Sequence, residues 1–307
     1  MNMEDTIIIL MSTYNGARFI TEQIESIKRQ TINNWKLYVW DDGSRDNTLE
    51  ILKKYEENGV LKIVSNERVG YPNGFYNLIN MRINGDYYAF CDQDDIWLPN
   101  KLEVAKKAIE NKKNPALYCS KKYIVDINLN IIGDDLEVEN GIYNAMFKSN
   151  KASGCTMLFN KKLYDILLKY RPQSSFAPYH DSWCYKIAVI FGEVIYDNIP
   201  RMLYRQHSAN IVGAYKNGWQ LFFKRVVGFD FTLKRYRCNY GTTNYAKEII
   251  YGYEQEMPQQ YLEILNDISN IRKSFMSRIR LFICSSISKK PIHEYVIVKM
   301  LIILGWM

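Results

Sequence analysis

The chain has 307 residues, of which 47% are hydrophobic and 24% are charged, and its formal net charge is +7. This composition predicts a sizeable buried core that forms without covalent or metal staples. Its six cysteines are scattered without C-x-x-C pairs or zinc-like spacing, which argues against a disulfide framework and a structural metal site. The cysteines therefore indicate a reducing compartment.

The N-terminus and the apolar segments give no sign of export or of a membrane span. Residues 1–5 lack the basic start of a secretory signal. The longest apolar candidate, residues 295–307, contains Lys299 and falls short of the roughly 20 residues that a spanning helix needs. We therefore expect a cytoplasmic protein that does not cross a bilayer.

Positive charge is concentrated in the last third of the chain. From Lys216 onward there are 14 Lys and Arg against 7 Asp and Glu, whereas the preceding residues balance at 26 against 26. This tail is rich in Tyr, Phe and Ile, and it suits contact with an anionic membrane surface or a polyanionic product. A solvated basic helical face explains the same pattern equally well.

The first 125 residues alternate β-rich runs with helical periodicity. We predict strands at residues 6–11, 35–39, 61–64, 87–91 and 116–120. Apolar residues at helical spacing separate them, as in Ile20, Ile24 and Ile27. The pattern predicts an α/β fold with a mostly parallel central sheet flanked by helices, which binds ligands at the carboxyl ends of its strands.

The middle of the chain predicts a continuation of this domain, and the end predicts a helical appendage. Strands are expected at 155–159 and 194–196, and helices at 161–170 and 181–191. Beyond residue 215, apolar residues recur every three or four positions at Ile264, Ile268, Ile271, Phe275, Ile279 and Phe282. We therefore expect one domain at 1–215 and a basic helical region at 216–307.

Two polar clusters follow the first two predicted strands. Residues 12–16 (Ser-Thr-Tyr-Asn-Gly) lead into a helix, where backbone amides and hydroxyls suit a nucleotide and Tyr14 offers a face for a base. Residues 41–48 begin with Asp41 and Asp42, which can accept hydrogen bonds from a base or ribose. Ordinary capped turns remain the alternative for both clusters.

The third cluster gives the most specific indication of a binding site. Asp92, Asp94 and Asp95 directly follow the apolar strand 87–91. Three carboxylates in four residues repel one another unless a cation compensates them, and oxygen ligands suit Mg²⁺ or Mn²⁺. The alternative is an exposed acidic turn before a helix capped by Asn100.

The fourth set lies at residues 179–183 and 204–210 and holds two of the three histidines, His180 and His207. Asp181 can serve as a general base, because a carboxylate held near an acceptor hydroxyl can take its proton. Arg205 and His207 can meet a diphosphate, and His207 can also bind a metal. A helix cap at Asp181 and a loop histidine at His207 are the alternatives.

Taken in order, these segments resemble the inverting family 2 glycosyltransferases, in particular the rhamnosyltransferase-like subgroup, whose nucleotide-binding fold is called GT-A. The resemblance spans about residues 5–213, and no motif covers the tail. It rests on residues 12–16, 41–44, 92–97, 153–156, 180–181 and 204–210.

The resemblance implies a role for each matching residue. The residues assigned to the donor nucleotide are Ser12, Tyr14, Asp41, Asp42, Arg68 and Asp92. Asp94 and His207 are the implied metal ligands, and Asp181 is the implied catalytic base. The residues assigned to the diphosphate or the acceptor are Asp95, Trp97, His180 and Arg205.

The resemblance therefore implies an enzyme that uses Mg²⁺ or Mn²⁺ to move a sugar, with L-rhamnose from dTDP-L-rhamnose as the first choice, to a hydroxyl of a lipid-linked or growing cell-surface polysaccharide. Contact with the inner face of the cell membrane is expected through the tail. The alternatives are a UDP-hexose donor and a non-catalytic sugar-nucleotide or glycan-binding protein. A nucleotidyltransferase is disfavoured because residues 12–16 lack a lysine and a second glycine, and nucleic-acid binding is disfavoured because no such motif is present.

Overall fold

The computed structural model describes residues 5–134, 141–147, 152–173, 178–207 and 241–284, together with 296, 299–300 and 302–305. The chain divides into two compact units: the first comprises Met1–Val138 and Asn150–His207, and the second comprises Glu139–Ser149 and Ser208–Met307. The predicted boundary near residue 215 lies outside the described residues. Each unit is described by itself below.

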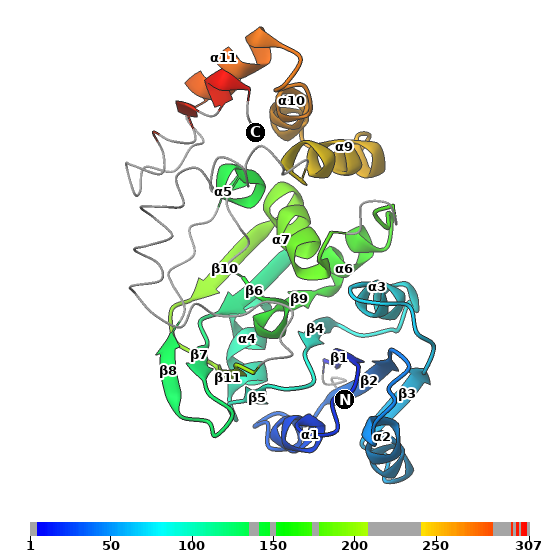
Figure 1. Cartoon of the computed structure of the whole chain (residues 1–307). Coiled ribbons are helices and arrows are strands. Elements are labelled where there is room, and N and C mark those ends of the chain that lie inside the picture. Colours follow the sequence, from blue (N-terminus) through cyan, green and yellow to red (C-terminus); the bar gives the residue numbers. More distant parts are fainter. Residues whose placement is uncertain are drawn as a thin grey trace. The chain divides into compact units, whose positions relative to one another are not determined.

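The first unit is built on a seven-stranded sheet (Figure 1). In spatial order its strands are β10 (Glu193–Asp197), β6 (Ala116–Ser120), β9 (Leu158–Asn160), β4 (Tyr87–Cys91), β1 (Ile7–Thr13), β2 (Trp35–Asp41) and β3 (Leu61–Ser65). All neighbours pair in parallel except β9, which runs antiparallel to both β4 and β6. The sheet is therefore mostly parallel, as predicted.

The central strand β1 is apolar along its length because both of its faces are covered. Ile7, Ile9 and Met11 belong to the core cluster that also contains Ile20 and Ile24 of helix α1 (Ile20–Lys28). The opposite face of the sheet carries aromatic rings from β4 and β9, and these rings contact one another. Buried β-branched residues thus favour extended structure at the centre of the molecule.

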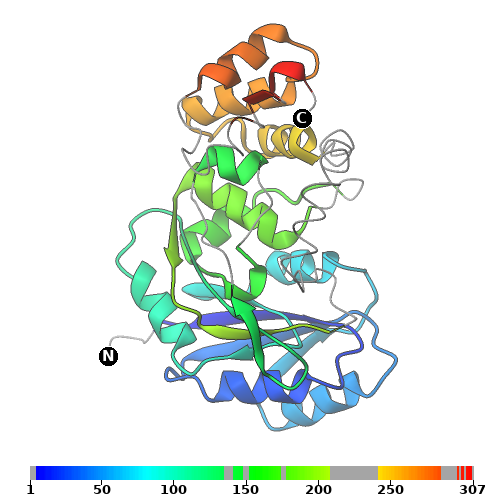
Figure 2. The same ribbon diagram turned by 60° about the vertical axis from the view of Figure 1, so that its left-hand side comes forward.

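Helices cover both faces of this sheet. Leu52 places helix α2 (Thr48–Glu57) on the same side as α1 and α4 (Lys101–Ile109). Helix α3 (Asn73–Asn80) lies on the opposite side of the sheet (Figure 2). On that side, Tyr164 of α6 (Lys161–Leu167) stacks on Tyr88. Helix α7 (His180–Phe191) completes that layer. The fold is α/β, as the sequence predicts.

One predicted strand is corrected by the structure. Residues 155–159 were expected to be extended, but Gly154–Thr156 form the 3₁₀ helix η1 and only Leu158–Asn160 form β9. The Thr156 hydroxyl donates to the Ser153 carbonyl at 2.8 Å, which closes this turn. The turn therefore brings Gly154 and Cys155 back to the carboxyl end of β4, next to the acidic cluster.

A second, four-stranded sheet borders the same end of the first unit. Its order is β5 (Ile96–Trp97), β11 (Met202–Arg205), β7 (Tyr123–Val125) and β8 (Ile131–Asp134). Strand β5 immediately follows the acidic segment 92–95, and β11 leads directly to His207. This pairing brings two motifs that lie more than a hundred residues apart into one place.

In the second unit, the described residues include the four helices α5 (Ile142–Phe147), α9 (Gly241–Tyr253), α10 (Gln259–Ser269) and α11 (Phe275–Ile283). The predicted apolar stripe is only partly buried, because Ile268 and Ile271 are in the core whereas Phe275 and Phe282 are exposed. Ser274 caps α11 by accepting from the Ser277 amide, so the chain turns between α10 and α11. Among the described helices, none combines the length and the hydrophobicity that crossing a membrane requires.

Candidate active site

The loops after β1 and β2 are joined to each other at the edge of the sheet. Thr13 and Asp41 lie opposite each other in the strand register, and the Thr13 hydroxyl donates to Asp41 at 2.9 Å. The Ser44 amide donates to the other oxygen of the Asp41 carboxylate at 2.8 Å. Because Asp41 is fully buried, its carboxylate supports the loop around the site.

The backbone amides at the start of the first helix are already hydrogen-bonded. The amides of Asn15, Gly16 and Ala17 donate to the side chains of Ser44, Thr48 and Asp46, respectively. The expectation that these amides bind a nucleotide is therefore wrong for all three positions. They hold the two loops together instead.

Gln93 ties the first loop to the acidic segment. Its side-chain amide accepts from the Tyr14 backbone N–H at 2.9 Å and donates to the Tyr14 carbonyl at 3.0 Å. A Cβ atom at Gly16 would stand 2.2 Å from Gln93 Oε1, so this position favours glycine. The two contacts fix the Tyr14 backbone beside the carboxyl end of β4.

Two donor residues implied by the resemblance lie together on the surface. The Arg68 guanidinium stands 5.2 Å from the centroid of the Tyr14 ring, and both side chains are exposed. Behind them, the Asp42 carboxylate accepts from the backbone amides of Val69 and Gly70 and thereby orders the loop that carries Arg68. Ser12 is partly exposed and lies against Gly74 of α3.

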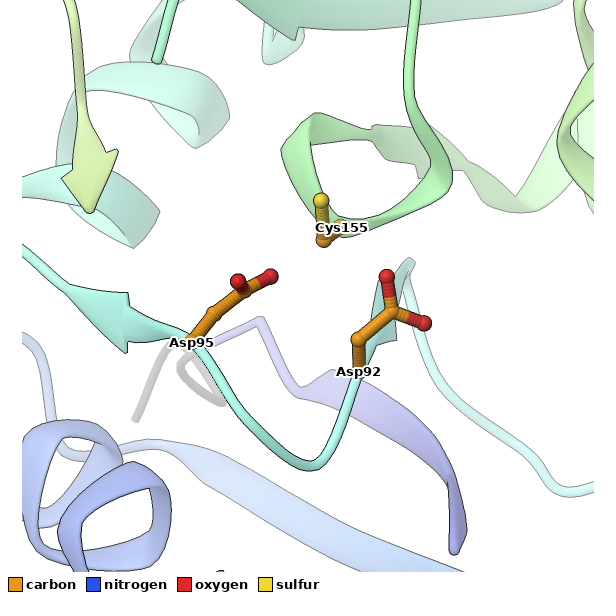
Figure 3. Close-up of side chains that lie close together, drawn as sticks. All are labelled: Asp92, Asp95 and Cys155. Atoms are coloured by element: carbon orange, nitrogen blue, oxygen red, sulfur yellow. The ribbon is translucent and has the colours of Figure 1, made fainter. Parts of the chain in front are cut away.

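The acidic segment forms a cluster with the turn that contains η1. A ligand atom of Asp92, one of Asp95 and the thiol of Cys155 all lie within 4.8 Å of one another. Figure 3 shows these three side chains close together. Burial, followed by the charges of Asp94 and Asp181, raises the pKa of Asp92 to about 7. Burial also raises the pKa of the Asp95 carboxyl and of the Cys155 thiol. Asp95 Oδ2 is buried without a hydrogen-bond partner in the described part of the chain.

The most accessible candidate ligands for a divalent ion are Asp94 and His207. His207 Nε2 lies 2.8 Å from Asp94 Oδ2, and the two side chains are 12% and 14% exposed. The His207 ring stacks on Phe19 at 4.9 Å, which fixes its plane. Carboxylate and imidazole donors fit Mn²⁺ or Mg²⁺. The crowded acids behind this pair supply the negative potential that attracts a cation.

Asp181 is brought to the cluster by the first turn of α7. Its carboxylate accepts from the Gly154 amide at 3.2 Å and from the Ser182 amide at 2.6 Å. Burial raises its pKa, and its negative charge is one of the causes that raise the pKa of Asp92. Two carboxylates that lie 89 positions apart in the sequence thus act on each other within one site.

The four residues assigned to the diphosphate or the acceptor, Asp95, Trp97, His180 and Arg205, are all buried. Trp97 is a core residue, and His180 stacks on Phe75 with ring centroids 3.7 Å apart. Burial lowers the pKa of His180 to about 3, so this imidazole is neutral. Arg205 donates to the Asp94 carbonyl and to Glu22, and its amide donates to Asp95. These side chains support the site from behind.

Sequence reasoning missed Lys122, which follows β6. Its ammonium group donates to the Ser153 hydroxyl and stands 4.1 Å from the centroid of the Tyr204 ring. Its positive charge acts to lower the pKa values of Asp92, Asp95 and Asp181. The pair Lys121-Lys122 at the end of a predicted strand was the available signal, but the sequence does not show which lysine turns inward.

Two solved structures share the fold of this chain. The chain is similar to S. aureus TarS residues 1–349 in complex with UDP-GlcNAc, with a TM-score of 0.57 and 16% identity over 91% of this chain and 76% of that one. It is also similar to a mannosyltransferase from Pyrobaculum calidifontis in complex with GDP-Man and Mn²⁺, with a TM-score of 0.52 and 15% identity over 99% of this chain and 86% of that one. The fold is that of the GT-A glycosyltransferases.

Sequence comparison then gives the family. The model of glycosyl transferase family 2 matches residues 8–165, which is just over half of the 307 residues. The chain belongs to this family.

Two relatives with specific names illustrate its range. An Escherichia coli UDP-Glc:alpha-D-GlcNAc-diphosphoundecaprenol beta-1,3-glucosyltransferase, WfgD, is 32% identical over 52% of this chain and 63% of its own length. A Shigella flexneri dTDP-rhamnosyl transferase, RfbG, is 31% identical over 66% of this chain and 74% of its own length. The alignment therefore spans less than two thirds of the first of these relatives.

Proposed function

We propose that this chain transfers a sugar from a nucleotide diphosphate to a hydroxyl of a lipid-linked or growing polysaccharide, with inversion at the anomeric carbon. The observation that supports the proposal is the convergence of Asp92, Asp94 and Asp181 at one end of the sheet. Asp92 and Asp94 lie in the loop after β4 and Asp181 lies in α7, yet the charges of Asp94 and Asp181 both act on Asp92. Asp181 is held in place by the Gly154 amide. A protein that only bound a sugar would have no use for a base beside the acidic segment.

The donor is held, on this proposal, by the loops after β1, β2 and β3. Tyr14 and Arg68 offer an exposed aromatic face and a cation for the base and the phosphates. Asp41 and Asp42 order these loops, and Ser12 and Asp92 line the path towards the diphosphate. Asp94 and His207 would hold a divalent ion, which when bound offsets the charge of the leaving diphosphate.

Asp181 acts as the base in the transfer step. The acceptor oxygen forms a bond to the anomeric carbon while the bond from that carbon to the diphosphate oxygen breaks, and Asp181 takes the hydroxyl proton. The raised pKa of Asp181 strengthens it as a base relative to an ordinary aspartate. A single attack from the face opposite the leaving group gives inversion.

The finer assignments concern the donor and the location. dTDP-L-rhamnose stays the first choice because of the segment 92–97 and the similarity to the Shigella flexneri enzyme. UDP-glucose is the second choice because of the similarity to the Escherichia coli enzyme. The transfer would take place at the inner membrane face, where the basic second unit could contact lipid.

The experiment is a hydrolysis and binding screen with purified full chain. dTDP-L-rhamnose, UDP-glucose, UDP-GlcNAc and GDP-mannose are incubated with Mn²⁺ or Mg²⁺, and release of the nucleotide diphosphate is measured. We expect one donor to be hydrolysed in a metal-dependent way. Calorimetry on Asp94→Ala should then show at least tenfold weaker binding of that donor with Mn²⁺ present, because a metal ligand is gone. No metal-dependent hydrolysis of any donor, or unchanged affinity in the variant, would overturn the proposal.

A further inference from the structure

Two exposed tyrosines lie side by side next to the start of helix α7, which carries Asp181. Tyr71, in the loop before α3, is 41% exposed, and Tyr179, just before α7, is 48% exposed. Their ring centroids are 5.5 Å apart, with an angle of 49° between the ring planes. Large aromatic side chains rarely stay exposed as a pair unless they contact a partner.

The pair is built on a rigid aromatic foundation. The Tyr71 ring meets the buried rings of His180 and Phe75 edge-on, at 6.0 and 6.4 Å. His180 and Phe75 stack on each other, and both meet Phe90 of β4 edge-on. The Tyr71 ring therefore rests on buried rings of α3 and α7, and the Tyr179 ring contacts Tyr71 in turn.

The backbone next to Tyr179 is also held in place. The Tyr76 hydroxyl of α3 donates to the Pro178 carbonyl at 2.9 Å. The same helix is fixed to Arg171, which donates to Asn77 at 2.7 Å and to Asn73 at 3.1 Å. Tyr71 and Tyr179 thus come from two loops that α3 connects, so their spacing is set before any ligand arrives.

The position of the pair relates it to the base. Tyr179 precedes α7 by one residue and Asp181 is the second residue of that helix. The Tyr71 ring contacts the ring of His180, the residue before Asp181, and burial, followed by the charges of Asp181 and Asp92, raises the pKa of Tyr71. Both tyrosines therefore lie next to the first turn of the helix that carries Asp181.

We propose that Tyr71 and Tyr179 form the subsite that binds the pyranose ring of the acceptor sugar. One face of a pyranose carries C–H groups, which pack against the electron-rich face of an aromatic ring, while its hydroxyls stay at the edge. Resting on this pair, the ring directs a hydroxyl towards Asp181. The exposed surface consists of two phenol rings, which suit an uncharged sugar. This inference rests on the proposed function, because it assigns the acceptor of that same site.

The test measures binding of two simple acceptor probes, methyl β-D-glucopyranoside and methyl N-acetyl-α-D-glucosaminide, by saturation-transfer NMR. The donor site of the full chain is first filled with the diamagnetic ion Mg²⁺ and with dTDP or UDP, whichever nucleotide the donor screen identifies. We expect saturation transfer to the C–H protons of at least one probe in the wild type, and about tenfold weaker binding in Tyr71→Ala and in Tyr179→Ala, since each removes one ring. Tyr71→Phe, which keeps the ring, should bind like the wild type.

The matched control is Tyr251→Ala on α9, where an exposed tyrosine of the second unit is removed. It should leave probe binding unchanged. Donor hydrolysis is measured on every variant, because it needs no acceptor sugar. Variants that hydrolyse donor normally but lose the probe support the subsite, whereas wild-type probe affinity in both alanine variants, or no binding to the wild type, overturns it. If the wild type itself hydrolyses no donor, the result would instead count against the proposed function.

Discussion

Single residues in this protein carry charge at a cost to stability. Asp92 and Asp181 are held among other acids and away from water, which raises the pKa of both. The compensation comes from Lys122, a buried lysine whose charge acts on both carboxylates. An arrangement of this kind is expected where a cation or a proton must later be exchanged.

Replacing the proposed base should separate binding from transfer. We expect Asp181→Asn to keep donor affinity and to lose transfer by on the order of 100-fold, because the amide cannot accept the hydroxyl proton. Calorimetry and a transfer assay with the donor found in the screen measure the two effects. Asp165→Asn on α6 is the control, since that exposed aspartate contacts Lys161 on the surface. Near-normal turnover in Asp181→Asn would remove this residue from the chemistry.

Asp92 should make stability depend on pH in a defined direction. Its folded pKa of about 7 lies above the unfolded value, so the folded protein binds more protons between about pH 4 and 7 and its stability falls as the pH rises through this window. Asp92→Asn removes that charge. The variant should therefore gain on the order of 1–4 kcal/mol of unfolding free energy above pH 7, and progressively less below it.

Urea denaturation in EDTA at pH 5, 6, 7 and 8 measures this gain. Addition of Mn²⁺ should reduce the difference between wild type and variant, because a cation compensates the same charge. A difference that is constant across the pH series would show that Asp92 is not the group responsible.

At the scale of elements, the turn η1 links the acidic segment to α7. A Cβ atom at Gly154 would lie 2.7 Å from His180 Nε2 and 3.2 Å from the Asp181 Cβ. His180 cannot retreat easily, because it is stacked in the aromatic layer against Phe75. The close approach of η1 to α7 therefore sets the position of the base.

Gly154→Ala should consequently damage both stability and transfer. We expect a loss of about 1–3 kcal/mol from overpacking and a fall in transfer rate of about tenfold or more from displacement of Asp181. Gly133→Ala on β8 is the control, because a Cβ there would meet only the end of Ile124 at 3.9 Å. Thermal unfolding and the transfer assay are run on both variants. Wild-type turnover in Gly154→Ala would mean that the turn does not position the base.

At the scale of the whole molecule, the second unit exposes apolar side chains on helix α11. Helix α11 exposes Phe275, Met276, Phe282 and Ile283, each more than 40% accessible. Arg280, on the same helix, pairs with Asp267, and the region from Lys216 onward carries an excess of positive charge. Apolar side chains beside basic ones are typical of helices that lie in the membrane interface.

We expect the full chain to float with vesicles that contain phosphatidylglycerol and not with pure phosphatidylcholine. The double variant Phe282→Ser and Ile283→Ser should float at least several-fold less, since it removes two exposed apolar side chains. Salt at about 0.5 M should weaken the wild-type interaction by screening its charges. Equal flotation of the wild type and the double variant would show that Phe282 and Ile283 do not contribute to membrane binding.

The sequence by itself determined the strands and the acidic motifs. Parallel strands buried on both faces need continuous apolar runs, so strands β4 and β6 have the predicted bounds. Acids at a strand end indicate a site, because burying a charged group without a partner costs free energy. The α/β fold and the acidic segment at residues 92–95 were therefore predictable, whereas a shared site with Asp181 was implied only by the resemblance to the family.

Only the tertiary structure decided which polar side chains face the ligand. His180, Trp97 and Arg205 belong to motifs, yet they pack inward, whereas Lys122 and Tyr71 stand at the site without belonging to a motif that we recognised. Strand β11 also brings His207 beside Asp94 from 113 positions away. Chain order cannot show this, because the direction of a side chain depends on which distant segments pack against it.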